Sequence, residues 1–278
     1  MTIFEIYSAM SLELDICMAQ NLGDRKEQQD RIAVFAHPKV PNITLCVLAD
    51  GMGGHEGGAL AADQVIHTAR LSLSQYDPDV ETPEHFLETL FNDTHTLIKS
   101  SRFINEKDPH STAVFLLLQP GLAMWAHCGD SRIYFLRGVQ VLRRTVDHSY
   151  VQRMISQGRI TPLEAKTHPQ RGMLTTSLGG RDAPHFDIDH IEHPEPGLSF
   201  ILCSDGLWAY FSDEEMGVIC GTQTAKGACQ HFINLARNRA HGYGDNVSLI
   251  VVKLFEKDDD EEDDEYEDED DDEDEDEE

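Results

Sequence analysis

The sequence predicts an α+β fold, because strand-like segments dominate the middle of the 278-residue chain and two helical segments lie together before them. Strands and helices do not alternate strictly, which argues against a doubly wound parallel sheet. A third observation concerns residues 256–278, which contain 21 acidic side chains and one lysine. We therefore expect one folded domain over residues 1–255 and a disordered acidic tail over residues 256–278.

The first part of the chain combines short apolar runs of strand length with two amphipathic helices. Leu14–Met18 and Ile43–Ala49 are the expected strands. A glycine-rich turn over 51–58 follows, and apolar residues then recur at helical spacing over 62–73. A second helix is expected after the Thr-Pro pair at 82–83, because threonine caps helices and proline suits their first turn.

The second part of the chain is richer in strands. Four of them, separated by turns, predict an antiparallel meander over 112–118, 123–128, 132–136 and 139–142. Residues 148–166 indicate short helices, and the proline-rich stretch 167–197 indicates mostly loop. The remaining elements are expected to be strands at 198–204 and 247–254 and helices at 212–219 and 224–240.

Composition excludes several classes of protein. The net charge of −29 comes mainly from the tail, and without a basic patch we expect no binding to nucleic acid. No apolar run approaches the ~20 residues of a membrane span, and no secretory signal is visible. The six cysteines show no CxxC spacing and are expected to be reduced core thiols. These features favour a cytoplasmic protein without a membrane segment.

Four aspartates stand at the ends of apolar strands, namely Asp50, Asp130, Asp205 and Asp245. Each one alone is typical of a turn, but three lie beside a glycine that permits close approach to the backbone. If the strands share a sheet, the carboxylates converge and need a cation to stay ionised. Carboxylate oxygens suit Mg²⁺ or Mn²⁺, and the Cys/His spacing of a structural zinc site is absent.

These aspartates lie in ordered motifs. The motifs are Arg25-Lys26-Glu27-Gln28-Gln29-Asp30, Asp50-Gly51-Met52-Gly53-Gly54-His55, Ser111-Thr112-Ala113, Gly129-Asp130-Ser131-Arg132, Thr145-Val146-Asp147-His148-Ser149, Ser204-Asp205-Gly206-Leu207-Trp208 and Asp245-Asn246-Val247-Ser248. Together with two segments near 168–179, these motifs follow one another over residues 14–254 in the order found in a known family. The sequence thus resembles the metal-dependent type 2C (PPM-type) protein serine/threonine phosphatases of bacteria. The resemblance implies a four-layer α-β-β-α sandwich, with helices flanking two central antiparallel sheets.

The resemblance also implies a site for two Mn²⁺ or Mg²⁺ ions, with a weaker third. Its implied ligands are Asp30, Asp50, Gly51, Asp130, Asp205 and Asp245. Asp50 would bridge two ions, Gly51 would offer its carbonyl oxygen, and Asp130 would help to hold the third ion. Asp30, or Gln29 through water, would lie near the second ion. The implied reaction is hydrolysis of phosphoserine and phosphothreonine on proteins by a metal-bridging water or hydroxide.

Two further residues are candidates for catalysis. Arg25 would grip the substrate phosphate with its two-pronged guanidinium. Some family members have a histidine directly after the Asp-Gly pair, as the acid that protonates the leaving oxygen, but Met52 stands here and cannot donate a proton. His55 is the candidate replacement, although a histidine in a glycine-rich turn more often faces solvent. His110 stands where the family usually has a glycine.

Two other functions remain open. A catalytically silent relative would use the same fold as a binding module, with its acidic tail docking a basic partner. A scaffold protein would act through the tail alone. The tail itself could simply keep the protein in solution, or it could dock a basic partner or shield the active site. For the enzyme, we expect a monomer that opposes a Ser/Thr kinase on phosphorylated protein substrates.

Overall fold

The computed structural model describes residues 12–53, 55–105 and 108–256, without the side chains of residues 55–56 and 102–105. The strands are β1 (Leu12–Asn21), β2 (Asp30–Ala36), β3 (Thr44–Met52), β4 (His110–Ser111), β5 (Ala113–Gln119), β6 (Leu122–Cys128), β7 (Arg132–Arg137), β8 (Gln140–Arg144), β9 (Asp187–Glu192), β10 (Leu198–Cys203) and β11 (Val247–Glu256). The helices are α1 (His55–Gln75), α2 (Pro83–Asn105), α3 (Tyr150–Ser156), α4 (Pro162–Lys166), α5 (Asp205–Trp208), α6 (Asp213–Thr222) and α7 (Ala225–Ala240). The expected boundary at residue 256 falls on the last residue of β11, and the rest of the acidic tail lies outside the described residues.

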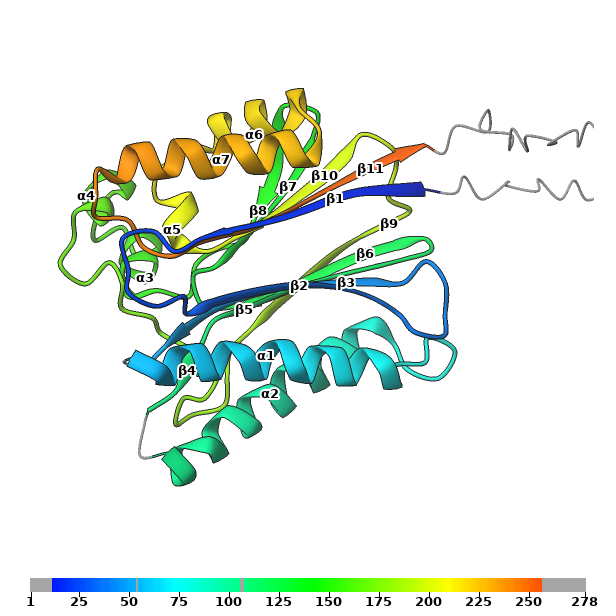
Figure 1. Cartoon of the computed structure of the whole chain (residues 1–278), viewed down its shortest axis with the longest axis horizontal. Coiled ribbons are helices and arrows are strands. Elements are labelled where there is room, and N and C mark those ends of the chain that lie inside the picture. The colour runs from blue at the N-terminus through cyan, green and yellow to red at the C-terminus, as the bar shows by residue number, and fades with distance from the viewer. Residues whose placement is uncertain (1–11, 54, 106–107, 257–278) are drawn as a thin grey trace, which may run out of the picture.

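The strands form two antiparallel sheets that pack face to face. Sheet A is five-stranded in the order β1-β11-β10-β7-β8, and sheet B contains β2-β3-β5-β6-β9 with the short β4 beside β3. Helices α6 and α7 cover the outer face of sheet A, and α1 and α2 cover the outer face of sheet B (Figure 1). The predicted four-layer α-β-β-α sandwich is therefore confirmed.

The apolar run in β3 is explained by burial of the strand on both faces. Leu45 and Val47 pack with α1 and α2, whereas Cys46 and Leu48 face the core between the two sheets. Strands buried on both sides are apolar at nearly every position rather than at alternate positions. The predicted cap of α2 is also present, since Thr82 Oγ1 accepts a hydrogen bond from the His85 N–H.

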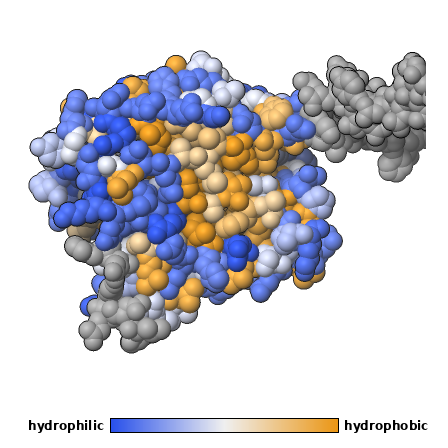
Figure 2. All heavy atoms as spheres, in the orientation of Figure 1, coloured by the Kyte–Doolittle hydropathy of each residue, from blue (hydrophilic) through white to orange (hydrophobic). Residues whose placement is uncertain are grey.

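The core between the sheets reaches the surface along one edge of the sandwich. Here β1 and β2 are the edge strands of their sheets, and apolar atoms gather between them (Figure 2). The partly buried side chains of this edge are Leu12, Leu14, Ile16, Ile32 and Val34. At the opposite edge, β8 and β9 are joined by an ion pair between Arg143 and Asp189. Among the described helices, none has the length and apolarity that a bilayer crossing requires.

Three sequence predictions were wrong in detail, and one strand, β2 before β3, was not predicted. The stretch 167–197, expected to be mostly loop, contains β9, which pairs with β6. The glycine-rich turn is shorter than predicted, because α1 already begins at His55. The four central strands do not form one meander, because residues 129–131 carry the chain from β6 in sheet B to β7 in sheet A. This crossing lies at the end of the sandwich where the motif aspartates gather.

Candidate active site

Five aspartates stand at strand ends at one end of the sandwich, the end where α5 and the start of β11 lie at the left in Figure 1. We call Asp30, Asp50, Asp130, Asp205 and Asp245 the aspartate cluster. Asp30 and Asp50 are opposite each other in the β2–β3 ladder. Asp205 follows the end of β10 and Asp245 precedes the start of β11, and these ends coincide because the two strands are antiparallel neighbours. Strand ends from both sheets thus build the cluster.

Hydrogen bonds tie the two sheets together beside the cluster. Ser204 Oγ donates to Asp30 Oδ2 at 2.8 Å, which links the end of β10 to the start of β2. The Gln29 N–H donates to Asn246 Oδ1 at 2.7 Å, which links the start of β11 to the same strand of sheet B. Because these bonds flank Asp30, Asp205 and Asp245, small shifts between the sheets would disturb the cluster directly.

The carboxyl groups of the cluster raise one another's pKa values. The pKa of Asp50 lies well above its usual range, because the group is buried and because the other four aspartates repel its charge. Burial, followed by the charge of Asp205, also raises the pKa of Asp130. An ionised cluster is therefore unstable without additional positive charge.

Asp30 and Asp205 show the same effect. Burial raises the pKa of Asp30 to about 7, although hydrogen bonds from Ser248 and Ser204 oppose the shift. Burial and the charge of Asp245 raise the pKa of Asp205 to about 6, although a backbone hydrogen bond with Gly206 opposes the shift. Both carboxylates therefore retain an unfavourable electrostatic energy that a cation would relieve.

Arg25 reaches the cluster from the loop between β1 and β2, where its guanidinium pairs with Asp245. That hydrogen bond is the main reason why the pKa of Arg25 is raised. The loop is held in place by Asp24, which pairs with Arg237 at 2.8 Å and accepts the Gly244 N–H at 2.7 Å. The side chain of Arg25 remains 58% exposed, so it borders the cluster and also faces solvent.

The glycines beside the aspartates allow close approach, as predicted, but the approaching group is another part of the chain. A Cβ atom on Gly51 would lie 1.9 Å from the carbonyl oxygen of Gly58, and one on Gly206 would lie 1.9 Å from that of Asn246. Gly129 has a φ of +107°, and a Cβ atom there would lie 2.6 Å from Thr112 Cγ2. Backbone packing at the strand ends therefore accounts for these glycines.

The candidate acid His55 lies at the first residue of α1, but its side chain is outside the described part of the structure. Its role stays a prediction. Met52 is half-buried at the end of β3, opposite His110 in the β3–β4 ladder. His110 contacts Ser177 Oγ at 3.1 Å and Asp108 at 3.3 Å. A histidine is therefore accommodated at the position where the family usually has a glycine, without breaking the β3–β4 ladder.

The sequence did not reveal a group of residues that frames Asp130. Arg132 makes two hydrogen bonds of 2.7 Å to Asp147, and its guanidinium carbon lies 3.5 Å from the centre of the Trp208 ring. Trp208 Nε1 donates to the Asp130 carbonyl oxygen at 2.9 Å. All these residues lie in the quoted motifs, but their partnerships depend on contacts between distant segments, which one sequence does not show.

Comparisons with known proteins identify the family of this chain. A family model described as protein phosphatase 2C matches residues 19–237. The protein phosphatase PhpP of Streptococcus pneumoniae is 30% identical over 253 residues, which cover 88% of this chain and 99% of PhpP. The structure of serine/threonine phosphatase Stp1 from Staphylococcus aureus has a TM-score of 0.79 at 27% identity, over 90% of this chain and 99% of Stp1.

A second solved structure carries metal. The catalytic domain of the serine threonine protein phosphatase PstP, in complex with 2 manganese ions, has a TM-score of 0.72 at 26% identity. The match covers 88% of this chain and 100% of that domain. With a family model over most of its length and a relative matched almost end to end, the chain belongs to the protein phosphatase 2C family.

Proposed function

We propose that this protein hydrolyses phosphoserine and phosphothreonine on protein substrates in a reaction that depends on divalent cations. The observation that supports this most directly is the aspartate cluster, in which buried carboxylates from both sheets repel one another. The relatives named as serine/threonine phosphatases support the same activity.

The residues of the cluster fit Mn²⁺ or Mg²⁺. Their donors are carboxylate and carbonyl oxygens, which hard cations prefer, and the raised pKa values indicate missing positive charge. Asp50 and the Gly51 carbonyl would serve two ions, with Asp205 and Asp245 completing one side. Asp30, or Gln29 through water, would lie near the other ion, and Asp130 would serve a weaker third ion. When bound, such cations acidify water and neutralise charge on phosphoryl oxygens.

The side chains of the protein would bind the substrate phosphate and place a positive charge beside it. Arg25 would exchange its pairing with Asp245 for the phosphate, since its exposed guanidinium presents two parallel donors to phosphate oxygens. The buried thiols of Cys46, Cys128 and Cys203 are unsuited to nucleophilic attack, because burial raises the pKa of Cys46 and Cys128 to about 12 and also raises that of Cys203. A cysteine-based mechanism is therefore disfavoured.

The silent binding module is the less favoured reading, because all five aspartates are present and the relatives are named as phosphatases. The substrates would be phosphoproteins made by an opposing Ser/Thr kinase. A cytoplasmic location is supported by the six cysteines, all of which are free thiols. The basic partner of the acidic tail stays a prediction.

The experiment that tests the proposal is dephosphorylation of a phosphothreonine peptide in the presence of Mn²⁺ or of EDTA. The measured quantity is the phosphate released. We expect activity with Mn²⁺ and none with EDTA. Arg25→Lys keeps the charge but loses the two-pronged grip, so its KM should rise by roughly tenfold with a smaller change in kcat. Absence of Mn²⁺-dependent phosphate release from any phosphopeptide would instead favour the silent binding module.

A further inference from the structure

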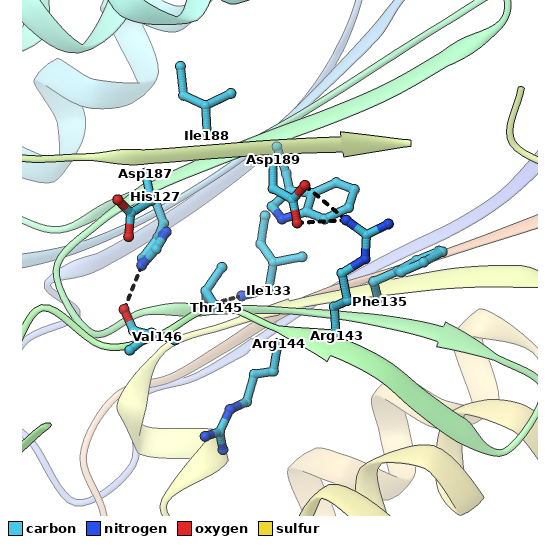
Figure 3. Close-up of a pocket in the computed structure, with 11 residues that line it drawn as sticks. His127, Ile133, Phe135, Arg143, Arg144, Thr145, Val146, Asp187, Ile188 and Asp189 are labelled. Atoms are coloured by element: carbon cyan, nitrogen blue, oxygen red, sulfur yellow. Dashed lines mark hydrogen bonds and ion pairs between the residues drawn. The ribbon is translucent and has the colours of Figure 1, made fainter. Parts of the chain in front are cut away.

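A second group of titratable side chains lies beside the aspartate cluster, where β6 and β9 pair. It consists of His127 in β6, His148 after β8, and Asp187 at the start of β9; Figure 3 labels His127 and Asp187. One ligand atom from each lies within 4.8 Å of the others, so the three could hold a metal ion. A cavity of about 140 Å³ opens next to His127 and Asp187.

The hydrogen bonds of the two histidines argue against a metal. His127 Nε2 lies 2.9 Å from the Val146 carbonyl oxygen, which can only accept, so Nε2 carries the proton. The Gly129 N–H donates to His148 Nδ1 at 3.3 Å, so the neutral ring carries its proton on Nε2. That proton points to Asp187 Oδ2 at 3.1 Å, in the place a cation would need. The two rings also stack, 4.4 Å apart and 18° from parallel, so their lone pairs do not converge.

The same hydrogen bonds run from Asp187 through the His148 ring to the backbone of Gly129. We call this chain of hydrogen bonds the relay. His148 holds this glycine twice, because its ring accepts the Gly129 N–H and its backbone N–H donates to the Gly129 carbonyl oxygen at 2.8 Å. Asp187 fixes the orientation of the ring. Burial lowers the pKa of His148 despite Asp187, which keeps the ring in the neutral form that the relay requires.

Gly129 directly precedes Asp130 at the point where the chain passes from sheet B to sheet A. The other side of this turn is held by Trp208, whose Nε1 donates to the Asp130 carbonyl oxygen. The backbone of Gly129 and Asp130 is thus clamped on both sides, while the Asp130 side chain is buried in the aspartate cluster. A carboxylate with fixed backbone is preorganised to bind a cation.

We infer that His148 and Asp187 are positioning residues that hold Asp130 in the orientation required for its cation. This rests on the proposed function only in taking Asp130 as a ligand of the weaker third ion. Loss of the ring acceptor should loosen the Gly129 N–H, although the Gly129 carbonyl stays bonded to the His148 backbone, and should so weaken that one ion, while the ions held by Asp50 and Asp205 are retained.

The variants separate the two hydrogen bonds of the ring. In His148→Gln the side-chain amide extends to the position of Nε2, so it can still donate to Asp187 but offers Gly129 no acceptor in place of Nδ1. In His148→Asn the amide oxygen stands near the position of Nδ1, so it can accept from Gly129 but does not reach Asp187. His185→Gln is the matched control, because the His185 ring packs against that of His148, 4.9 Å away and tilted by 47°, and lies 3.5 Å from Asp187 Oδ1, the oxygen that His148 does not contact.

The experiment is a calorimetric titration of the full chain with Mn²⁺, with Asp130→Asn as the reference that identifies the Asp130-dependent ion. His148→Gln should weaken that binding event by about 10-fold, the low end of typical effects for residues behind metal ligands. His148→Asn should recover most of the affinity, and His185→Gln should match the wild type. Thermal unfolding of each variant, measured in EDTA, separates metal affinity from stability.

Three results would overturn the inference. One is a His148→Gln variant that melts lower but binds the Asp130-dependent ion normally, since His148 would then be only structural. Another is a Mn²⁺ or Zn²⁺ site that survives Asp130→Asn and disappears in His148→Gln, since the histidines would then bind metal themselves. If Asp130→Asn removes no binding event, the inference also fails, but tight Mn²⁺ binding and phosphate release would still test the proposed function separately.

Discussion

Asp24 and Asp30 lie close together in the sequence but behave in opposite ways. Hydrogen bonds with Arg237 and with the Gly244 N–H lower the pKa of Asp24 to about 2, whereas burial raises that of Asp30 to about 7. The same contrast recurs around Asp130, because Asp147 has Arg132 as a partner and Asp130 has no such ion pair among those the structure describes. The site therefore contains two kinds of carboxylate.

The difference separates residues that hold the frame from residues proposed to do the chemistry. Outside the aspartate cluster, Asp24 and Asp147 are paired with arginine, carry their own counter-charge and fix the loops around the site. Within the cluster, Asp245 pairs with Arg25, whose side chain is largely exposed. The aspartate cluster lacks sufficient counter-charge, so its stability and its function should depend on the same added cation. Changing one member of each kind should therefore have opposite effects on the metal-free protein.

The largest effect is expected from Asp50→Asn. The kcat/KM for a phosphothreonine peptide should fall by roughly a thousandfold, because the cations lose their shared carboxylate. In EDTA the same variant should resist urea better than the wild type, since one of the repelling buried groups is neutral. A metal-free Asp50→Asn chain less stable than the wild type would contradict this account of the cluster.

A smaller effect, this time on stability alone, is expected from Arg132→Met. The substitution leaves Asp147 unpaired with a side chain only 8% exposed, which should cost about 3 kcal/mol of unfolding free energy. Urea denaturation in EDTA measures this loss. Arg237→Met is the control: its pair with Asp24 is more exposed and screened by solvent, so its loss should lower the unfolding free energy clearly less. If both variants lost the same unfolding free energy, the buried ion pair of Arg132 with Asp147 would contribute no more to stability than the exposed pair of Arg237 with Asp24. That result would contradict the distinction.

The smallest effect concerns pH. The folded pKa values of Asp30 and Asp205, about 7 and about 6, exceed the ordinary value of 3.8, so the folded chain binds more protons than the unfolded chain between those limits. The metal-free protein should therefore lose stability as pH rises from about 4 to about 7, and its urea midpoint should be lower at pH 8 than at pH 5. Saturating Mn²⁺ at pH 8 should restore the midpoint. A metal-free midpoint that rises with pH would contradict the raised values.

The sequence predicted the interior of the fold better than its edges. The strands β3, β5, β6, β10 and β11 are almost continuous apolar runs, because both their faces are buried. The strands missed, β2 and β9, are the two edges of sheet B. β9 carries aspartate, histidine and glutamate between its isoleucines, which keeps an edge strand from pairing with other chains and also hides it from a search for apolar runs.

The site shows a similar division. Strand-end aspartates could be found from sequence, because a carboxylate directly beside an apolar run is a local pattern. Their gathering is shown by the structure, and their roles as metal ligands remain proposals. The relay from Asp187 through His148 could not be found, because Asp187 lies in a segment expected to be loop and its partner lies 39 residues earlier in the chain.

The aspartate cluster draws its members from the strand ends of both sheets. If divalent cations bind there as proposed, they would link sheet A to sheet B. Manganese supply in the cell would then govern how long each molecule survives proteases as well as how fast it works, since a ligand that binds only the native fold lowers the unfolded population. A shortage of manganese would then lower the amount of the enzyme as well as its activity.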